Sequence, residues 1–274
     1  MVDILSIINN AYLLYKENWR SVITAFAVIF LITFVFGIIN FVVQLPGSFI
    51  CDEGSPFAEN AVLVLLFCVS PAILQIITSV FETLITIIIH MAVLKPFDEM
   101  AAGKPISSWT FGFINQAGNA LLVIIFRVIV FGVSYTPFVI TLIPFIPALI
   151  ASKGSIEVLL GGGAALLITF LLGVFLSIVL NLLLCFLEIE VAVGGNGILD
   201  AAAKSAGLVT SNFFDVILFA ALWFFIGIGI GLITTIMACT VCLLPLAWLI
   251  PSFIVGPVEL LSKVILWRRL KNLG

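Results

Sequence analysis

The chain has 274 residues, of which 63% are hydrophobic and only 9% are charged, and its formal net charge at pH 7 is −3. Soluble domains carry about 25% charged residues, so a water-soluble fold cannot hide this much apolar side chain. The composition therefore predicts an all-α integral membrane protein. The sequence has no basic run and no nucleic-acid-binding motif, so we expect no nucleic-acid partner.

The first predicted unit begins with a helix on the membrane surface and continues into two spans. Apolar residues recur on one face of residues 3–18, at Ile4, Ile8, Ala11 and Tyr15. The first span is expected at about Arg20–Gln44. Residues 61–94 are apolar throughout, which is too long for one crossing and too short for two. Because Pro71 divides this run, the second span is expected at about 71–95.

The second predicted unit has the same order of elements. Residues 105–119 form a second amphipathic segment, and a third span begins near Ala120. Three prolines are expected to bend or end this span, namely Pro137, Pro144 and Pro147. The fourth span is expected at about Gly161–Glu188, with the glycines at 161–163 in the loop that enters it.

The third predicted unit holds the clearest pattern, V-G-G-N-G-I-L-D-A-A-A-K-S-A-G-L-V-T-S-N at 193–212. It is typical of a glycine break, an amphipathic helix and an asparagine that caps the next helix. A polar stripe of Asp200, Lys204, Gly207 and Ser211 lies apart from Leu199, Ala202, Ala206 and Val209. The fifth span follows at about Phe213–Met237. The sixth is expected at about Leu246–Leu266, kinked by Pro251 and Pro257, before the basic end W-R-R-L-K.

A threefold internal repeat is the organisation that these elements favour. Asn18, Asn119 and Asn212 each stand at the same offset before a Val-Ile pair, at the step from a surface helix to a span. The units would cover about 4–104, 105–197 and 198–274 of a single polytopic domain. The alternative is that any chain entering a membrane from a surface helix uses a polar residue there.

The distribution of basic residues predicts how the chain is oriented. With the N-terminus inside, the inner segments carry nine basic residues and the outer loops only Lys153. The nine are Lys16, Arg20, Lys95, Lys104, Lys204, Lys263, Arg268, Arg269 and Lys271. This bias predicts six transmembrane helices in the cell (plasma) membrane, with both termini and three amphipathic helices on the cytoplasmic side.

The step from Glu188 to Asn212 carries a resemblance to a known family. Its order is an acidic-apolar stretch, small residues, A-x3-S and then Asn. In this it resembles the membrane domain fused to some glycerophosphoryl diester phosphodiesterases, and stand-alone prokaryotic six-span relatives of that domain. In that family the esterase chemistry belongs to a separate soluble domain, so the resemblance implies a membrane module and carries over no catalytic residue.

The sequence predicts neither an enzyme nor a metal or cofactor site. His90 is the single histidine of the chain, which rules out a site with several histidine ligands. None of the motifs G-x-S-x-G, H-E-x-x-H or a P-loop occurs.

Polar residues inside the predicted spans are the candidate intramembrane site. Charged side chains within a membrane are costly unless they are paired or hydrated, so they mark functional positions. Arg127 and Glu188 fall at similar depths and are expected to pair, whereas Glu82 is more isolated and is a candidate proton or cation ligand. Asn181 is expected to add a hydrogen bond. The alternative is a purely structural pair, or an Arg127 side chain that reaches to the inner surface.

Cysteines on the predicted outer face and glycines in the fifth span suggest two further features. Cys51, Cys239 and Cys242 fall on the predicted outer face and are candidate thiols for a disulfide, with free apolar cysteines as the alternative. Gly227 and Gly231 are four residues apart on one helix face, a spacing that favours close helix packing within the chain or between subunits.

Two classes of function remain open. The first is a lipid-binding or scaffold module that binds membrane lipids and acts with a partner protein or a second copy. The second is a transporter or channel-like protein with a site near Glu82 and Arg127. The scarcity of polar residues in most spans favours the first.

Overall fold

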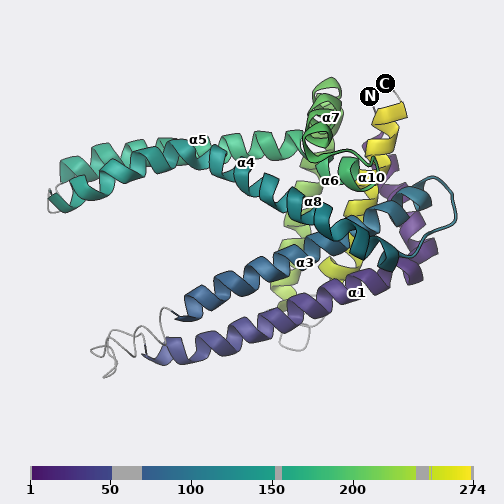
Figure 1. Ribbon diagram of the computed structural model, residues 1–274, viewed down its shortest axis with the longest axis horizontal. Helices are drawn as coiled ribbons and strands as arrows, with labels where there is room; N and C mark the ends of the chain where they lie inside the picture. The colour runs from purple at the N-terminus through teal and green to yellow at the C-terminus, as the bar shows by residue number, and fades with distance from the viewer. Residues whose placement is uncertain (1, 51–69, 152–155, 239–246, 248, 273–274) are drawn as a thin grey trace.

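In the computed structural model, residues 2–50, 70–151, 156–238, 247 and 249–272 are described, and every regular element in these ranges is a helix. The long helices are α1 (Ile4–Ile50), α3 (Ser70–Ala101), α4 (Trp109–Ala151), α5 (Ile156–Leu183) and α8 (Phe213–Ala238) (Figure 1). The shorter ones are α6 (Leu187–Ala192), α7 (Ile198–Ser211), the π-helical turn η3 (Pro251–Val255) and α10 (Gly256–Asn272). The all-α prediction is therefore confirmed.

Five helical stretches in the described ranges are long and apolar enough to cross a membrane. They cover Ile4–Ile39, Val80–Ala101, Asn115–Ala151, Gly161–Ala192 and Phe213–Met237. The last of them matches the predicted fifth span. Large apolar side chains point outward along these helices, for example Leu171, Ile178 and Ile236. Because a soluble protein does not expose so much apolar surface, this exterior fits a lipid environment.

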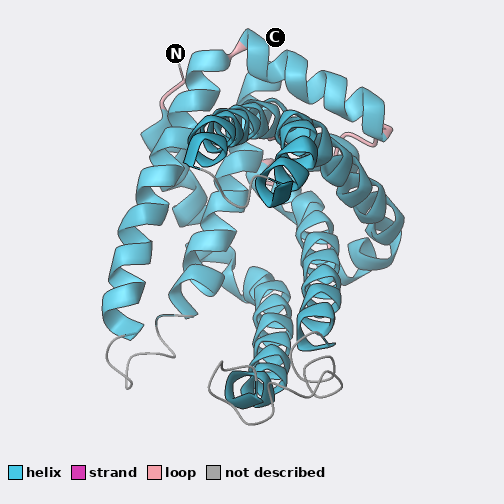
Figure 2. Cartoon of the chain, turned by 90° about the vertical axis from the view of Figure 1, so that its left-hand side faces the viewer, coloured by secondary structure: helices cyan, strands magenta, loops and turns pink. Residues whose placement is uncertain are grey.

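The helices form pairs that run outward from one shared end of the molecule. Helices α4 and α5 lie side by side, and α1 and α3 form a second pair (Figures 1 and 2). The α4–α5 pair is tight because Gly173 leaves room: a Cβ atom there would lie 3.2 Å from the Ser134 carbonyl oxygen. The Thr141 and Thr169 hydroxyls, 2.9 Å apart, add a hydrogen bond between the two helices.

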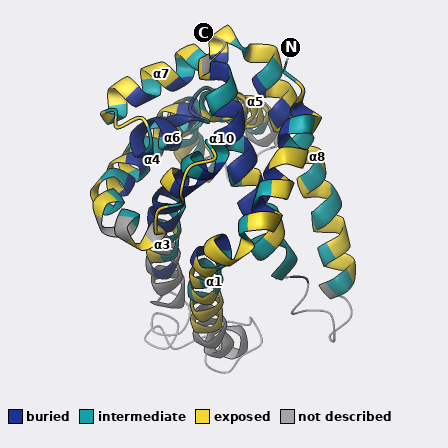
Figure 3. Ribbon diagram, turned by 90° about the vertical axis from the view of Figure 1, so that its right-hand side faces the viewer, coloured by how far each residue is buried: buried dark blue, intermediate teal, exposed yellow. Residues whose placement is uncertain are grey.

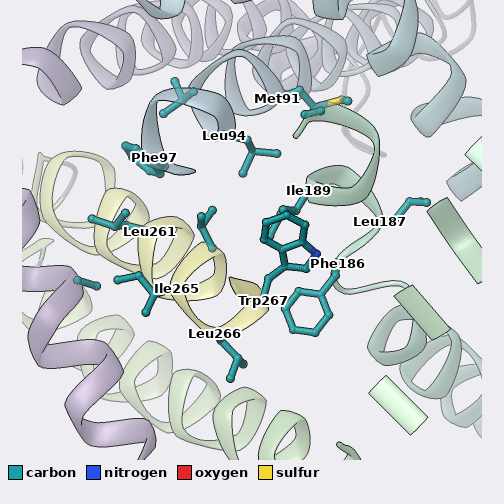
Figure 4. Close-up of a cluster of buried hydrophobic side chains, with 14 of the residues drawn as sticks. Met91, Leu94, Phe97, Phe186, Leu187, Ile189, Leu261, Ile265, Leu266 and Trp267 are labelled. Atoms are coloured by element: carbon teal, nitrogen blue, oxygen red, sulfur yellow. The ribbon is translucent and has the colours of Figure 1, made fainter. Parts of the chain in front are cut away.

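The buried core sits where the helix pairs meet, near the start of α1 and the end of α10 (Figure 3). Figure 4 shows Phe97 of α3, Phe186 just before α6 and Ile189 of α6 in this cluster, with Leu261, Leu266 and Trp267 of α10. Helix α10 therefore lies among the other elements at this end, and its side chains hold them together.

Two of the three asparagine steps are breaks between helices. Asn18 interrupts α1 with φ −113° and ψ 18°, and Asn212 separates α7 from α8 with φ −128° and ψ 37°. In each case the side-chain amide donates to the carbonyl oxygen four residues earlier, Leu14 or Leu208, at 3.0 Å. Asn212 stands at the predicted N-cap position of α8, because its carbonyl oxygen accepts the Val216 N–H at 3.1 Å. Its side-chain amide, however, closes the preceding helix.

The third asparagine does not mark a boundary. Asn119 lies inside α4, which runs without interruption from Trp109 to Ala151, and its amide donates to the Gln116 side-chain oxygen at 3.0 Å. The prediction of a separate amphipathic helix at 105–119 is therefore wrong for this segment. Its polar residues are accommodated within the continuous helix and do not end it.

Several positions at which a helix end was predicted lie inside continuous helices. Helix α4 continues through Pro137, Pro144 and Pro147, and α5 contains the glycines at 161–163. Helix α3 likewise passes Lys95 and Pro96 and ends at Ala101. In the apolar segments of α4 and α5 no water competes for backbone groups, so these helices tolerate residues that would end them in water. At Pro251 the predicted disturbance takes the form of the π-helical turn η3.

The predicted fourth span corresponds to the candidate span Gly161–Ala192, which contains a break at residues 184–186, between α5 and α6. Ser205 of α7 is fully buried against this break, where its hydroxyl donates to the Leu183 carbonyl oxygen at 2.8 Å. The same hydroxyl accepts the Phe186 N–H at 3.2 Å. The Ser205 hydroxyl thus hydrogen-bonds a carbonyl group at the end of α5 and an N–H group just before α6. These two bonds explain the serine of the A-x3-S pattern at Ala201–Ser205.

Replacing Ser205 with alanine is expected to lower the free energy of unfolding by about 1–2 kcal/mol, because two buried backbone groups lose their partner. Thermal unfolding in detergent, followed by circular dichroism, measures this loss. Ser211→Ala, on the exposed face of the same helix, is the matched control and should change little. Equal effects of the two variants would contradict the assigned role of Ser205.

Candidate functional site

A fully buried carboxylate lies where α6, α7 and α10 meet. Glu190 of α6 has an exposed fraction of 0%. Its oxygens accept hydrogen bonds from Trp267 Nε1 at 2.7 Å and from Asn196 Nδ2 at 2.9 Å, and Lys271 Nζ lies 2.9 Å away. A buried carboxylate is costly unless it is paired and hydrogen-bonded, and Glu190 meets both conditions.

The loop after α6 is shaped around this carboxylate. A Cβ atom on Gly194 would lie 2.6 Å from the Glu190 carbonyl oxygen and 2.9 Å from its Oε2, so only glycine fits without displacement. Gly195 turns the chain with φ 65°, a conformation that favours glycine. Asn196 then reaches Glu190, and its own Oδ1 accepts from Lys204 of α7 at 2.5 Å.

The basic end of the chain connects the same region to α1 and α3. Arg268 Nη1 lies 2.6 Å from Asp98 Oδ1 near the end of α3, and Arg269 Nη1 donates to Ser6 Oγ in α1 at 3.3 Å. Lys271 also lies over the Trp267 ring, 4.4 Å from its centroid. The sequence W-R-R-L-K thus makes specific contacts with three other helices, beyond the predicted role of a basic stop.

The structure brings together two of the four residues of the predicted intramembrane site. Arg127 Nη2 lies 2.8 Å from Glu188 Oε1, so the predicted pair is present. The Arg127 Nε atom is buried and has no hydrogen-bond partner among the described residues. Glu82 makes no salt bridge with a described residue, and Asn181 donates within its own helix to the Ser177 carbonyl oxygen at 2.8 Å. A functional role for these residues stays a prediction.

An apolar groove with two charged residues opens between α8 and α10. It has a volume of about 320 Å³, and α8 lines it with Val216, Phe219, Ala220, Trp223 and Phe224. Leu182 and Cys185 line it near the end of α5, and Glu259 and Lys263 line it from α10. Trp223 Nε1 donates to Ser262 Oγ at 3.1 Å, which fixes the two walls to each other.

Lys263 links this groove to the Arg127–Glu188 pair. Its charge acts on Glu188, His90 and Cys185, so the ammonium group lies near the predicted polar site. Lys263 makes no salt bridge with any residue in the described ranges. Among the same residues, no group of three or more His, Cys, Asp or Glu side chains is placed to hold a metal ion.

The predicted thiol site lies outside the described residues, because Cys51, Cys239 and Cys242 all fall there. Cys185 is a free, partly buried thiol. Gly227 and Gly231 face open space, since a Cβ atom at either would meet nothing within 4 Å. Close packing of this face within the described part of the chain is therefore not found, and packing between subunits stays a prediction.

Sequence reasoning missed the partners of Glu190. Trp267 and Lys271 are four residues apart, on one face of α10, and Gly194, Gly195 and Asn196 follow α6 closely. The glycine turn at Gly194 and Gly195, close after the acidic residue Glu190, was the sequence signal that could have indicated this site.

Comparison with models of known protein families, with curated proteins and with solved structures gives no match for this chain.

Proposed function

We propose that this chain is a non-enzymatic membrane module that binds membrane lipids and acts as a scaffold for a partner protein. The observation that carries the proposal is the state of the buried polar side chains. In the described ranges these are Thr78, Ser134, Glu190, Ser205 and Ser262, and each has a partner within the chain.

A transport path needs polar groups that face water or a solute. Here Glu190 is saturated by donors from α10 and from the loop between α6 and α7. Ser134 and Ser262 donate to carbonyl oxygens of their own helices. The outward faces of the long helices carry mainly apolar side chains. These features favour a module that packs against lipid and holds a fixed shape.

The proposed arrangement in the membrane has six spans, with both chain ends on the cytoplasmic side of the cell membrane. The five candidate spans and the segment at 246–266 supply the crossings. Helix α1 begins and α10 ends at the same end of the molecule, where Val2 N donates to Asp215 Oδ1 at 3.0 Å (Figure 3). The bias of basic residues toward the inner segments supports the orientation.

We propose the threefold repeat on narrower support. Asn18 and Asn212 share the same backbone break and the same backward hydrogen bond, which is the behaviour expected of equivalent positions. Asn119 departs from this pattern, so the middle unit would have lost its break while keeping the order of its helices.

Transport is the second candidate function, and one observation favours it. Arg127, Glu188 and Lys263 gather charge within apolar helices, and the buried Arg127 Nε has no partner among the described residues. Such residues often belong to a substrate or proton path.

Reconstitution separates the two functions. The purified chain is placed in liposomes, and proton and potassium flux are followed with entrapped fluorescent dyes, while native mass spectrometry in mild detergent records bound lipids. We expect retained lipids and no flux above that of empty liposomes. Saturable flux that Glu82→Gln or Arg127→Met abolishes would overturn the scaffold proposal and establish transport.

A further inference from the structure

We propose that the groove between α8 and α10 is a binding site for an anionic phospholipid, with its phosphate at Lys263 and an acyl chain along Phe219, Trp223 and Phe224. This inference rests on the proposed lipid-binding function and gives it a site and a headgroup class. A fatty acid also joins an anionic head to an acyl chain, so the experiment below must distinguish it from the phospholipid.

The shape and lining of the groove suit an acyl chain. Its volume of about 320 Å³ is within the usual range for small-molecule sites, roughly 300–1,000 Å³. Val216 and Phe224 lie eight residues apart on α8, which corresponds to about 12 Å of apolar wall. Because Trp223 of α8 donates a hydrogen bond to Ser262 of α10, the two walls of the groove are held at a fixed spacing.

Lys263 is the basic residue that lines the groove, and it offers an anion its point of attachment. Arg127 and Lys263 supply two cations in this region, and Glu188 and Glu259 supply two carboxylates. Arg127 already engages Glu188 at 2.8 Å. His90 also lies within range of Lys263. Lys263 itself has no salt-bridge partner in the described part of the chain, so its ammonium group is available to a phosphate.

Lys263 lies close to the basic end of α10. It precedes Trp267 by four residues, or about 6 Å along α10, and Arg268 and Arg269 follow directly at the polar end of the helix. A lysine side chain near this end of α10 can extend its ammonium group toward the phosphate layer of a bilayer. The apolar wall formed by Phe219 and Trp223 then continues toward the interior, where an acyl chain lies.

Glu259 is the one group on the groove that opposes an anionic ligand. It lies one turn before Lys263 on α10 and also lines the groove. Its carboxylate is therefore expected to weaken binding of an anionic lipid without abolishing it. This gives two neighbouring substitutions with opposite expected signs.

The test uses the full chain in neutral detergent, titrated with phosphatidylglycerol carrying brominated acyl chains, which quench nearby tryptophan fluorescence. Phosphatidylcholine with the same chains and brominated oleate are the comparison ligands. We expect phosphatidylglycerol to bind most tightly, Lys263→Met to weaken it roughly tenfold or more and Glu259→Gln to tighten it. Ala220→Phe, which fills the groove without a change of charge, should also prevent quenching.

Lys16→Met removes an exposed charge from α1 and is the matched control, expected to bind as the wild type does. Thermal unfolding of each variant checks that it remains folded. Equal affinity for phosphatidylglycerol and phosphatidylcholine, or wild-type binding by both Lys263→Met and Ala220→Phe, would overturn the inference. Tighter binding of oleate would replace the phospholipid with a fatty acid and overturn it as well. Each of these outcomes leaves the proposed function standing, which is decided by the flux assay and by the lipids retained in native mass spectrometry.

Discussion

Glu190→Ala is expected to be strongly destabilising, by about 3–5 kcal/mol in the free energy of unfolding. The substitution removes the acceptor for Trp267 Nε1 and Asn196 Nδ2 and the partner of the Lys271 ammonium group. Because Glu190 is fully buried, no water replaces these bonds without entry into the core. The junction of α6, α7 and α10 should loosen as a unit.

Thermal or SDS-induced unfolding in detergent, followed by circular dichroism and tryptophan fluorescence, measures this effect. Glu190→Gln keeps an oxygen acceptor but loses the charge, so it should fall between the wild type and the alanine variant. Lys271→Met is expected to cost less than Glu190→Ala, because the Lys271 side chain is 40% exposed and Glu190 keeps two other donors. A Glu190→Ala variant as stable as Lys271→Met would show that the carboxylate does not organise the junction.

The apolar runs predicted where the helices lie, but not where they end. Composition alone indicated an all-helical chain, and the breaks at Asn18 and Asn212 occur at the expected residues. Helix ends at Pro137 or at the glycines of α5 did not occur, because rules learned from soluble proteins assume that water competes for the backbone. A break at 184–186 was not predicted, since its stabilising partner Ser205 is remote in sequence.

The sequence predicted a contact of the candidate site only where the positions of two residues along their spans placed them at the same depth. Arg127 and Glu188 were paired because each was placed at a similar distance from the inner surface. Glu190 stands two residues from Glu188, yet its partner Trp267 lies 77 residues further along the chain. No local pattern specifies that contact, which depends on how α10 packs against α6. Glu82 and Asn181 were grouped with the pair because they are polar residues inside predicted spans. Among the described residues, no salt bridge or hydrogen bond joins them to the pair.

Glu188→Leu is expected to lower the free energy of unfolding by about 2–3 kcal/mol, and to cost more than Arg127→Met. Loss of the Glu188 carboxylate leaves Arg127 and Lys263 as two cations in an apolar region. Loss of the Arg127 guanidinium is less harmful, because Glu188 still lies within range of Lys263. A larger loss for Glu188→Leu than for Arg127→Met would therefore indicate that Glu188 compensates the charges of both Arg127 and Lys263.

A double-mutant cycle with Arg127→Met, Glu188→Leu and the combined variant tests this, with unfolding in detergent as the measurement. The combined variant should be more stable than the sum of the single losses predicts, because neither charge is then left unpaired. If Arg127 reached to the membrane surface and did not depend on Glu188, the single effects would simply add. Addition of the losses within about 0.5 kcal/mol would therefore reject the pair as a stabilising contact.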